Sequence, residues 1–102
     1  MFSNYEECIK AIDFLLQVDL NEISLEREFA IERSFEIIGG VINDWDSNGL
    51  INRKIDSLFD LAINMRHKVS HFYCGLNVPI VREAIKDLDS LKKLIIKKQK
   101  KA

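Results

Sequence analysis

Proline, glycine and cysteine are scarce in this chain. Its 102 residues include one proline, four glycines and two cysteines. So few helix-interrupting residues are typical of long helices joined by short connections. Two cysteines cannot build the disulfide framework of a small secreted protein, so we expect reduced thiols, with Cys8 in the core and Cys74 in a loop.

Long apolar runs and a secretion signal are also missing. No stretch approaches the roughly 18 consecutive apolar residues that a membrane-spanning helix needs. The first residues, MFSNYEEC, carry acids where a signal peptide carries basic residues. We therefore predict a cytoplasmic protein without membrane contact, and the chain length predicts a single domain over residues 1–102.

A net charge of −1 conceals a strong polarisation. Residues 1–60 contain 13 acidic and 5 basic residues, a balance of −8, whereas residues 61–102 contain 3 acidic and 10 basic residues, a balance of +7. This pattern indicates an anionic partner for the C-terminal half, or contact between acidic and basic surfaces of two subunits. The basic end, KKLIIKKQKK, is either a solvated helix end that frays from about residue 97 or a contact for nucleic acid.

Hydrophobic residues recur with helical spacing almost throughout, and no strand pattern occurs. We expect helices over residues 4–18 and 25–45, a third helix from about residue 53 and a fourth from about residue 78. Four helices with short connections predict an all-α, antiparallel up-and-down four-helix bundle. A chain of this size has a modest core, which favours burial of a further helix face in a homodimer.

Local signals place the ends and the core of these helices. Ser3 and Glu6 are spaced as a capping box at the start of the first helix. Pro79 suits the first turn of the fourth helix. We place Ile55 on the inner face of the third helix, and Trp45 in the core rather than on a surface that stacks with bases.

Two features of the second helix allow more than one interpretation. Gly39 and Gly40 each cost roughly 1 kcal/mol relative to alanine inside a helix. Such a pair is typical of close helix–helix approach, which we expect at a dimer interface or against the third helix. Glu32 and Glu36, off the apolar stripe, form a solvated or interfacial face or pair with an arginine across the dimer.

The third helix carries an arginine on its apolar side. At 100° per residue, Arg66 falls about 40° from the centre of the apolar stripe, close to the direction of Phe59 and Ala62. Arginine is almost never fully buried without a partner. Arg66 is therefore either paired with an internal acid or placed where the stripe opens into a cleft or an interface.

His71 and Tyr73 follow this arginine in the stretch MRHKVSHFY. In a straight helix Arg66 and His71 would point about 140° apart, so they converge most easily if the helix ends near residues 70–72. Arginine suits phosphate oxygens, and histidine exchanges protons near neutral pH. Together they suffice to cleave RNA without a metal, and Tyr73 suits a phosphate or a base. Alone, however, Arg-x4-His recurs by chance in many helical proteins.

Two segments together resemble the HepT-like proteins, a branch of the HEPN superfamily. That family has Arg-Asn, three residues, His, any residue and Tyr, followed by a Gly-containing turn and an amphipathic helix, which MRHKVSHFYCGLNVPIVREAIKDLDSLKKLI matches. Its second helix has a Glu-Arg pair, then Glu, two apolar residues and Gly, which AIERSFEIIGGVINDW matches. The resemblance covers roughly residues 25–97.

The resemblance implies a homodimeric all-α bundle of HEPN type whose Arg-x4-His motifs face a cleft between protomers. It implies a metal-independent endoribonuclease toxin that needs no cofactor. Arg66 would bind the phosphate and His71 would act as general base or acid. Tyr73 would accept AMP from an MNT-type nucleotidyltransferase antitoxin, within a dimer or a larger toxin–antitoxin assembly. Bulk and negative charge at this tyrosine would then oppose RNA binding.

Other residues near this motif are candidates for supporting roles, and some depart from the family pattern. His67, Glu36 and Arg33 are the supporting candidates. His67 replaces the family asparagine and would alter rate or specificity, Gly39-Gly40-Val41 replaces Gly-Glu-Ala, and Asn77 replaces aspartate. His67 and His71 have metal-ligand spacing, but no third ligand lies nearby, so we predict no metal site.

Two alternatives to the toxin stay open. The first is a catalytically silent HEPN protein that binds a nucleotidyltransferase or its nucleotide in the same cationic pocket. The second is a purely structural dimerising bundle in which Arg66 is a paired interior charge. In that last case Arg66→Ala would unfold the protein, because an unpaired buried acid would remain.

Overall fold

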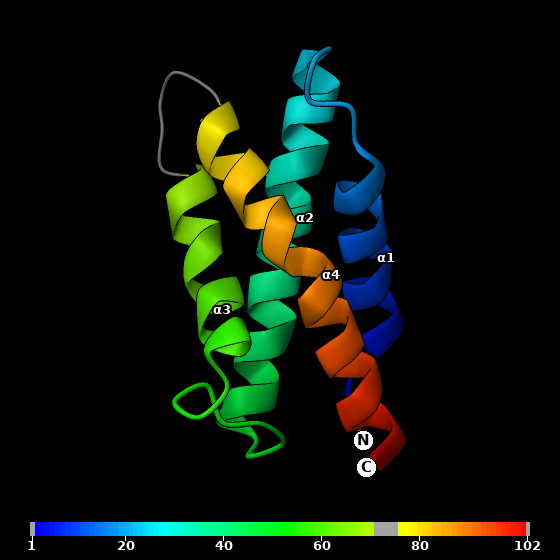
Figure 1. Cartoon of the computed structure of the whole chain (residues 1–102), viewed down its shortest axis with the longest axis vertical. Coiled ribbons are helices and arrows are strands. Elements are labelled where there is room, and N and C mark those ends of the chain that lie inside the picture. Colours follow the sequence, from blue (N-terminus) through cyan, green and yellow to red (C-terminus); the bar gives the residue numbers. More distant parts are fainter. Residues whose placement is uncertain (1, 71–75, 102) are drawn as a thin grey trace.

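The computed structural model describes residues 2–70 and 76–101, without the side chains of His67 and Ser70. Across these residues the chain forms α1 (Tyr5–Gln17), α2 (Leu25–Ser47), α3 (Ser57–Ser70) and α4 (Val78–Lys101), with no strand (Figure 1). The all-α prediction is confirmed. Within the same residues, none of the helices is both long and apolar enough to cross a membrane.

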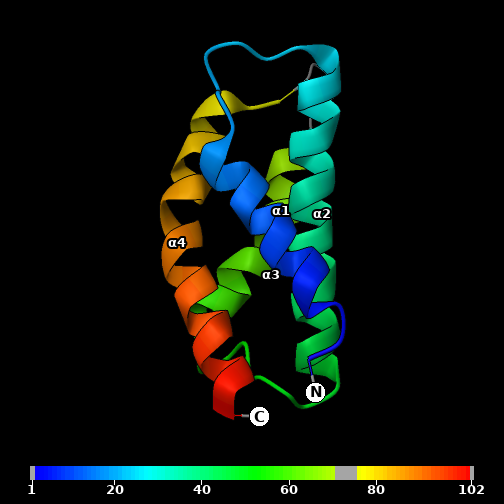
Figure 2. The same ribbon diagram turned by 90° about the vertical axis from the view of Figure 1, so that its right-hand side faces the viewer.

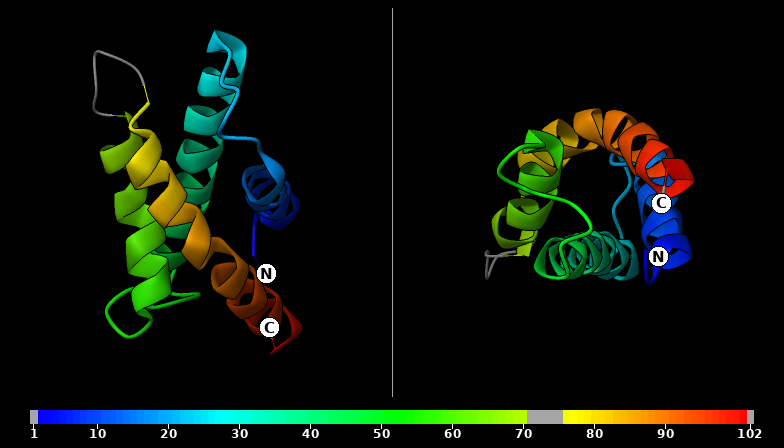
Figure 3. Two further views of the ribbon diagram at one scale, coloured as in Figure 1. Left: turned by 45° about the horizontal axis from the view of Figure 1, so that its top comes forward. Right: turned by 90° about the horizontal axis from the view of Figure 1, so that it is seen from below.

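Successive helices run in opposite directions around one core. α2 packs against α1 and α3, and α4 packs against the same two helices. Seen from one end, α4 arches over the core opposite α2 (Figure 3). Turned by 90°, the bundle shows α1 between α4 and α2, with both termini at one end (Figure 2). The side of α2 turned away from the core is not covered by another described helix.

Each helix contributes a stripe of buried apolar side chains to the core. Cys8 of α1 and Trp45 of α2 are fully buried, as predicted. The Trp45 indole donates a hydrogen bond to the Ser3 carbonyl at 2.8 Å, and its ring contacts that of Phe2 with 4.8 Å between the centroids. These two contacts hold the residues before α1 against the C-terminal end of α2.

This attachment explains why the predicted capping box at Ser3 and Glu6 is wrong. The N-cap of α1 is Asn4, in the left-handed region with φ of 57°, and its side chain makes no capping hydrogen bond. Because the Ser3 carbonyl is held by Trp45, the chain turns at Asn4 and the helix begins at Tyr5.

The predicted start of the third helix near Arg53 is also wrong, because α3 begins at Ser57. The Arg53 amide donates to Asp46 Oδ1 at 3.0 Å, and its guanidinium bonds Asp60 Oδ1 at 2.7 Å. These bonds hold the segment before α3 in turns. Ile55 consequently is 77% exposed rather than on the inner face, which corrects a second prediction.

The fourth helix begins where the sequence predicts, with Pro79 in its first turn. The Asn77 side chain accepts a hydrogen bond from the Ile80 amide at 3.2 Å and so caps the helix. α4 then continues to Lys101, beyond residue 97, where a fraying helix end was one of the two alternatives for the basic segment.

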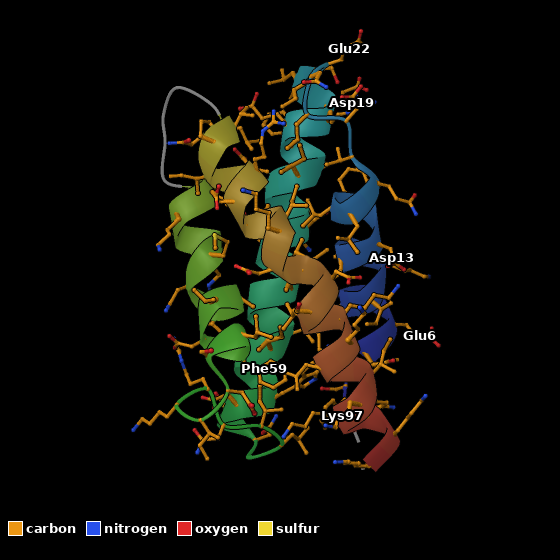
Figure 4. All side chains as sticks on the ribbon, in the orientation of Figure 1. Glu6, Asp13, Asp19, Glu22, Phe59 and Lys97 are labelled. Carbon is orange, nitrogen blue, oxygen red and sulfur yellow. The ribbon has the colours of Figure 1, made fainter. Side chains whose placement is uncertain are left out.

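Part of the charge polarisation is satisfied inside the chain. Lys92 of α4 bonds Asp13 of α1 at 2.6 Å, and Figure 4 shows Asp13 on the stretch of α1 beside α4. Lys98 lies 3.6 Å from Asp56, which precedes α3. The acidic N-terminal half and the basic C-terminal half therefore meet along the seams of one bundle, in addition to any contact between subunits.

Candidate functional site

Arg66 occupies the last turns of α3 and faces α2, as its position on the apolar stripe predicts. Its side chain is partly buried, and its Nε atom is fully shielded from solvent. Phe59, two turns earlier on the same side, is fully buried between the helices (Figure 4). The apolar side of α3 thus changes from a closed core at Phe59 to a partly open position at Arg66.

Gly39 of α2 makes room for this arginine. A Cβ atom at Gly39 would lie 3.1 Å from Cδ and 3.5 Å from Cβ of Arg66. It would also lie 3.2 Å from the Ala62 carbonyl oxygen, one turn earlier on α3. The carbon stem of the arginine therefore lies directly on the backbone of α2, at a close approach of the two helices. This outcome matches one of the two expectations for the glycine pair, a close contact with the third helix.

An acidic stripe on α2 continues from this contact. Glu28, Glu32 and Glu36 are spaced four residues apart, so they share one side of the helix. Burial, followed by the neighbouring carboxylates of Glu28 and Glu36, raises the pKa of Glu32. Glu32 and Gly39 are seven residues apart and differ by only about 20° around the helix axis. Because α2 and α3 are antiparallel, Glu32 lies toward the C-terminal end of α3. Its carboxylate adds to the negative electrostatic potential that the helix dipole produces at that end.

Two of the predicted supporting residues, Arg33 and Glu36, form an ion pair with each other. Arg33 Nη1 lies 3.4 Å from Glu36 Oε2, and their side chains are 72% and 49% exposed. Around the axis of α2, Arg33 points about 120° away from Gly39, and Glu36 points about 60° away from it. Neither residue is therefore fixed in a position that supports Arg66 in this protomer.

The remaining predicted site residues lie outside the described part of the chain. This applies to His71, Tyr73 and the loop residue Cys74, and to the side chain of His67. The convergence of His71 and Tyr73 with Arg66 stays a prediction. Among the residues that the structure describes, no group of three His, Cys, Asp or Glu side chains could hold a metal ion.

An open groove between α3 and α4 was missed by the sequence analysis. It has a volume of about 650 Å³. Its apolar wall includes Met65, Ile80 and Ala84, with Lys68 among its charged lining residues. Met65 and Lys68 are three residues apart on α3, a spacing that could have signalled a shared face. The groove lies beside the C-terminal end of α3, on the opposite flank of that helix from Gly39.

Comparison with known proteins gives the family. The model of the ribonuclease HepT-like family matches residues 5–97, from the start of α1 almost to the end of α4. Searches of curated proteins and of solved structures gave no match. The family match extends the resemblance seen over residues 25–97 to the first helix. The chain therefore belongs to the HepT-like family, a family of ribonucleases.

Proposed function

We propose that this protein is a metal-independent endoribonuclease toxin in which Arg66 and His71 carry the reaction. The observation that supports it best is the placement of Arg66. A cation sits partly buried at the mouth of the α2–α3 seam, on the backbone of Gly39, in a chain of a ribonuclease family. An arginine that extended into solvent would not lie against the α2 backbone, so position 39 would not have to be glycine.

The proposed reaction is an attack of the RNA on its own backbone. His71 takes the proton from a ribose 2′-hydroxyl, whose oxygen then forms a bond to the adjacent phosphorus. The bond from phosphorus to the 5′-oxygen breaks, and that oxygen leaves with a proton from a general acid. Arg66 neutralises the charge that builds on the phosphate oxygens. The products are a 2′,3′-cyclic phosphate and a 5′-hydroxyl end.

The packing of Arg66 adds to its value in this reaction. A long flexible side chain normally loses conformational entropy when it binds a phosphate. Contact between the arginine stem and the α2 backbone removes part of that freedom before the RNA arrives. The guanidinium is thus held near the C-terminal end of α3. The other motif residues, His71 and Tyr73, come directly after this helix in the sequence.

The proposal includes a partner that controls the toxin. An MNT-type nucleotidyltransferase antitoxin in the same cytoplasm would transfer AMP from ATP to the Tyr73 hydroxyl, with release of pyrophosphate. The added phosphate is an anion two residues from His71, and Arg66 is a cation suited to pair with it. The modified tyrosine would then compete with RNA for the arginine.

One observation favours a second candidate, a catalytically silent HEPN protein. The carboxylates of Glu28, Glu32 and Glu36 run along α2 toward the C-terminal end of α3, and such a field opposes the approach of an RNA backbone. A silent protein would keep the cationic pocket only to bind the nucleotidyltransferase or its nucleotide.

Cleavage of a mixed RNA by the purified protein in excess EDTA tests the proposal. Arg66→Ala and His71→Ala should each lower the rate by about 100-fold or more. Lys10→Ala removes an exposed cation of α1 and should leave the rate unchanged. Intact mass shows whether Tyr73 carries AMP, and circular dichroism shows whether each variant is folded.

The outcomes separate the candidates. Cyclic phosphate ends that disappear in both folded motif variants support the ribonuclease. No cleavage by folded, unmodified wild-type protein contradicts it and leaves the silent binding protein. An Arg66→Ala variant that does not fold supports the structural bundle, in which Arg66 is a paired interior charge.

A further inference from the structure

The outward side of α4 carries a row of exposed basic side chains. At 100° per residue, they fall within an arc of about 60°, on the side of the helix opposite its buried stripe. We call them the α4 row, which consists of Arg82, Lys86, Lys93, Lys97 and Lys100, all exposed. Figure 4 labels Lys97, near the C-terminal end of the row. At 1.5 Å per residue the row extends over about 27 Å.

The packing of α4 depends on two other lysines of the same helix, on its flanks. Lys92 bonds Asp13 of α1 at 2.6 Å, and Lys98 lies 3.6 Å from Asp56, which precedes α3. Among the described residues, no member of the α4 row forms an ion pair with another helix. The contacts that build the bundle therefore do not account for the row.

Two acidic residues of α4 border the row. Glu83 bonds Lys86 at 2.9 Å, and Asp89 lies 3.1 Å from Lys93. All four side chains are 61% or more exposed, and ion pairs between such exposed groups contribute little to stability. Five cations and two acids along one side of a helix produce a positive potential, in a chain whose net charge is −1. A surface that serves only solubility normally mixes both signs.

The row begins at the end of the bundle where Arg66 lies. The C-terminal end of α3 and the N-terminal end of α4 meet there (Figure 1). The last turns of α3 carry Arg66 on their α2 side and Lys68 on their α4 side, where Lys68 lines the open groove. The α4 wall of this groove includes Glu83, the neighbour of Arg82 in the sequence. Cations therefore continue from the α2–α3 seam, by way of Lys68, to the first member of the row.

We propose that the α4 row binds the phosphate backbone of the RNA substrate, outside the catalytic motif, and directs the RNA toward Arg66. Lysine and arginine side chains bind a phosphate backbone because each contact releases the counterions condensed on it. The role of the row rests on the proposed function, since the bound RNA is the same substrate. The residues of the row position the RNA and do not touch the reacting atoms.

The composition of the row favours RNA over a protein partner. Between Arg82 and Lys100 the arc contains no apolar side chain. Protein interfaces are depleted in lysine and are anchored by buried aromatic and apolar residues. Contacts between lysine and phosphate need no such anchor and carry no sequence information. The row should therefore add affinity for any RNA, whereas the motif at the end of α3 decides where the RNA is cut.

Binding of an RNA that cannot be cleaved tests the row by itself. A fluorescent RNA of about 30 nucleotides, long enough to reach both the motif and the row, carries 2′-O-methyl groups in place of the attacking hydroxyls. The full-length double variant Lys93→Gln/Lys97→Gln removes two cations of the row. The matched control, Lys10→Gln/Lys54→Gln, removes two exposed cations of α1 and of the segment before α3, with the same change of net charge. Fluorescence anisotropy measures the dissociation constant at several salt concentrations.

The row variant should lose both affinity and salt dependence. Each lost phosphate contact lowers the slope of log affinity against log salt concentration by about 0.7, so two lost contacts should lower it by about 1.4. At about 0.1 M salt the dissociation constant should rise by about tenfold or more, and the difference should shrink toward high salt. The control variant should match the wild type in slope and affinity. Circular dichroism confirms that each variant is folded.

Cleavage gives a second measurement. With a long, unmodified RNA the row variant should show a KM about tenfold or more above that of the wild type and an unchanged kcat, because the row binds ground state and transition state equally. An RNA of about four nucleotides cannot reach the row from the motif, so the variant should cleave it as the wild type does.

Two results would overturn the proposal. The first is a row variant that binds RNA with the slope and affinity of the wild type, including the case in which it instead loses contact with an acidic protein surface. The second is an equal loss of affinity in both double variants, which would reflect net charge alone. A wild-type protein that binds RNA through the row without cutting it contradicts only the proposed function. A row variant that cuts long RNA with an unchanged KM contradicts only the role of the row.

Discussion

Replacing Gly39 by alanine tests the contact that positions Arg66. The change adds one methyl group, 3.1 Å from Cδ of Arg66 and 3.2 Å from the carbonyl oxygen of Ala62. The arginine carbon belongs to a flexible side chain and can move by a few tenths of an ångström. The carbonyl oxygen belongs to the backbone of α3, so that contact can relax only if the two helices separate.

Two opposing terms set the size of the effect. Alanine in place of glycine gains about 1 kcal/mol of helix propensity. Overpacking of a tight contact costs about 1–3 kcal/mol. Gly40→Ala is the matched control, because its methyl group gains the same propensity and meets nothing within 4 Å. We expect Gly40→Ala to raise the free energy of unfolding by up to about 1 kcal/mol and Gly39→Ala to lie about 1–3 kcal/mol below it.

Urea unfolding followed by circular dichroism measures both variants, at low protein concentration so that association contributes least. RNA cleavage is the second readout. Because its methyl group displaces the arginine stem, Gly39→Ala should slow cleavage while the protein stays folded, whereas Gly40→Ala should not. If the two variants are equally stabilising and equally active, then α2 does not hold Arg66 and the structural argument for its role is lost.

Further predictions concern the helix cap, the anchored N-terminus and the buried thiol. Ser24→Ala removes the side chain that accepts from the Arg27 amide at 3.1 Å, so the free energy of unfolding in urea should fall by about 1 kcal/mol. Trp45→Phe deletes the hydrogen bond to the Ser3 carbonyl and should cost about 1–2 kcal/mol, measured by circular dichroism; an unchanged stability would contradict that bond. Burial raises the pKa of the Cys8 thiol from 9.0 to about 12. Because the folded-state pKa is the higher one, its contribution to stability is complete below pH 9 and is lost as the pH rises toward 12. Cys8→Ala should remove that pH dependence, measured by urea unfolding between about pH 8 and 11.

The sequence predicts the architecture well because hydrophobic periodicity records it directly. Each helix must bury one stripe, and a spacing of three or four residues identifies that stripe without knowledge of its partner. The same rule places Arg66 on the inner side of α3. The inward direction of Arg66 therefore follows from its spacing relative to Phe59 and Ala62, before any contact is known.

Periodicity fails where short-range polar bonds compete with the helix. Arg53 and Ile55 fit the apolar pattern of α3, yet the Arg53 bonds to Asp46 and Asp60 hold that segment in turns. The start of α1 is moved by a bond from a distant residue, the Trp45 indole. Both corrections arise from one or two hydrogen bonds at a helix end, and such bonds leave no periodic trace in the sequence.

The two adjacent glycines show most clearly what the sequence leaves open. In the sequence Gly39 matches the family pattern and Gly40 does not, but both expectations, a contact with the third helix or a dimer interface, were available for each. The structure assigns the first to Gly39, because a methyl group there would meet Arg66 and Ala62. Consecutive helix positions point about 100° apart, so the turn of α2 that contains Gly39 and Gly40 lacks side chains in two directions. In our proposal for the function, the arginine that binds RNA rests on one of these two sides. Within the described part of one protomer, the contact with α3 therefore explains Gly39, whereas no contact explains Gly40.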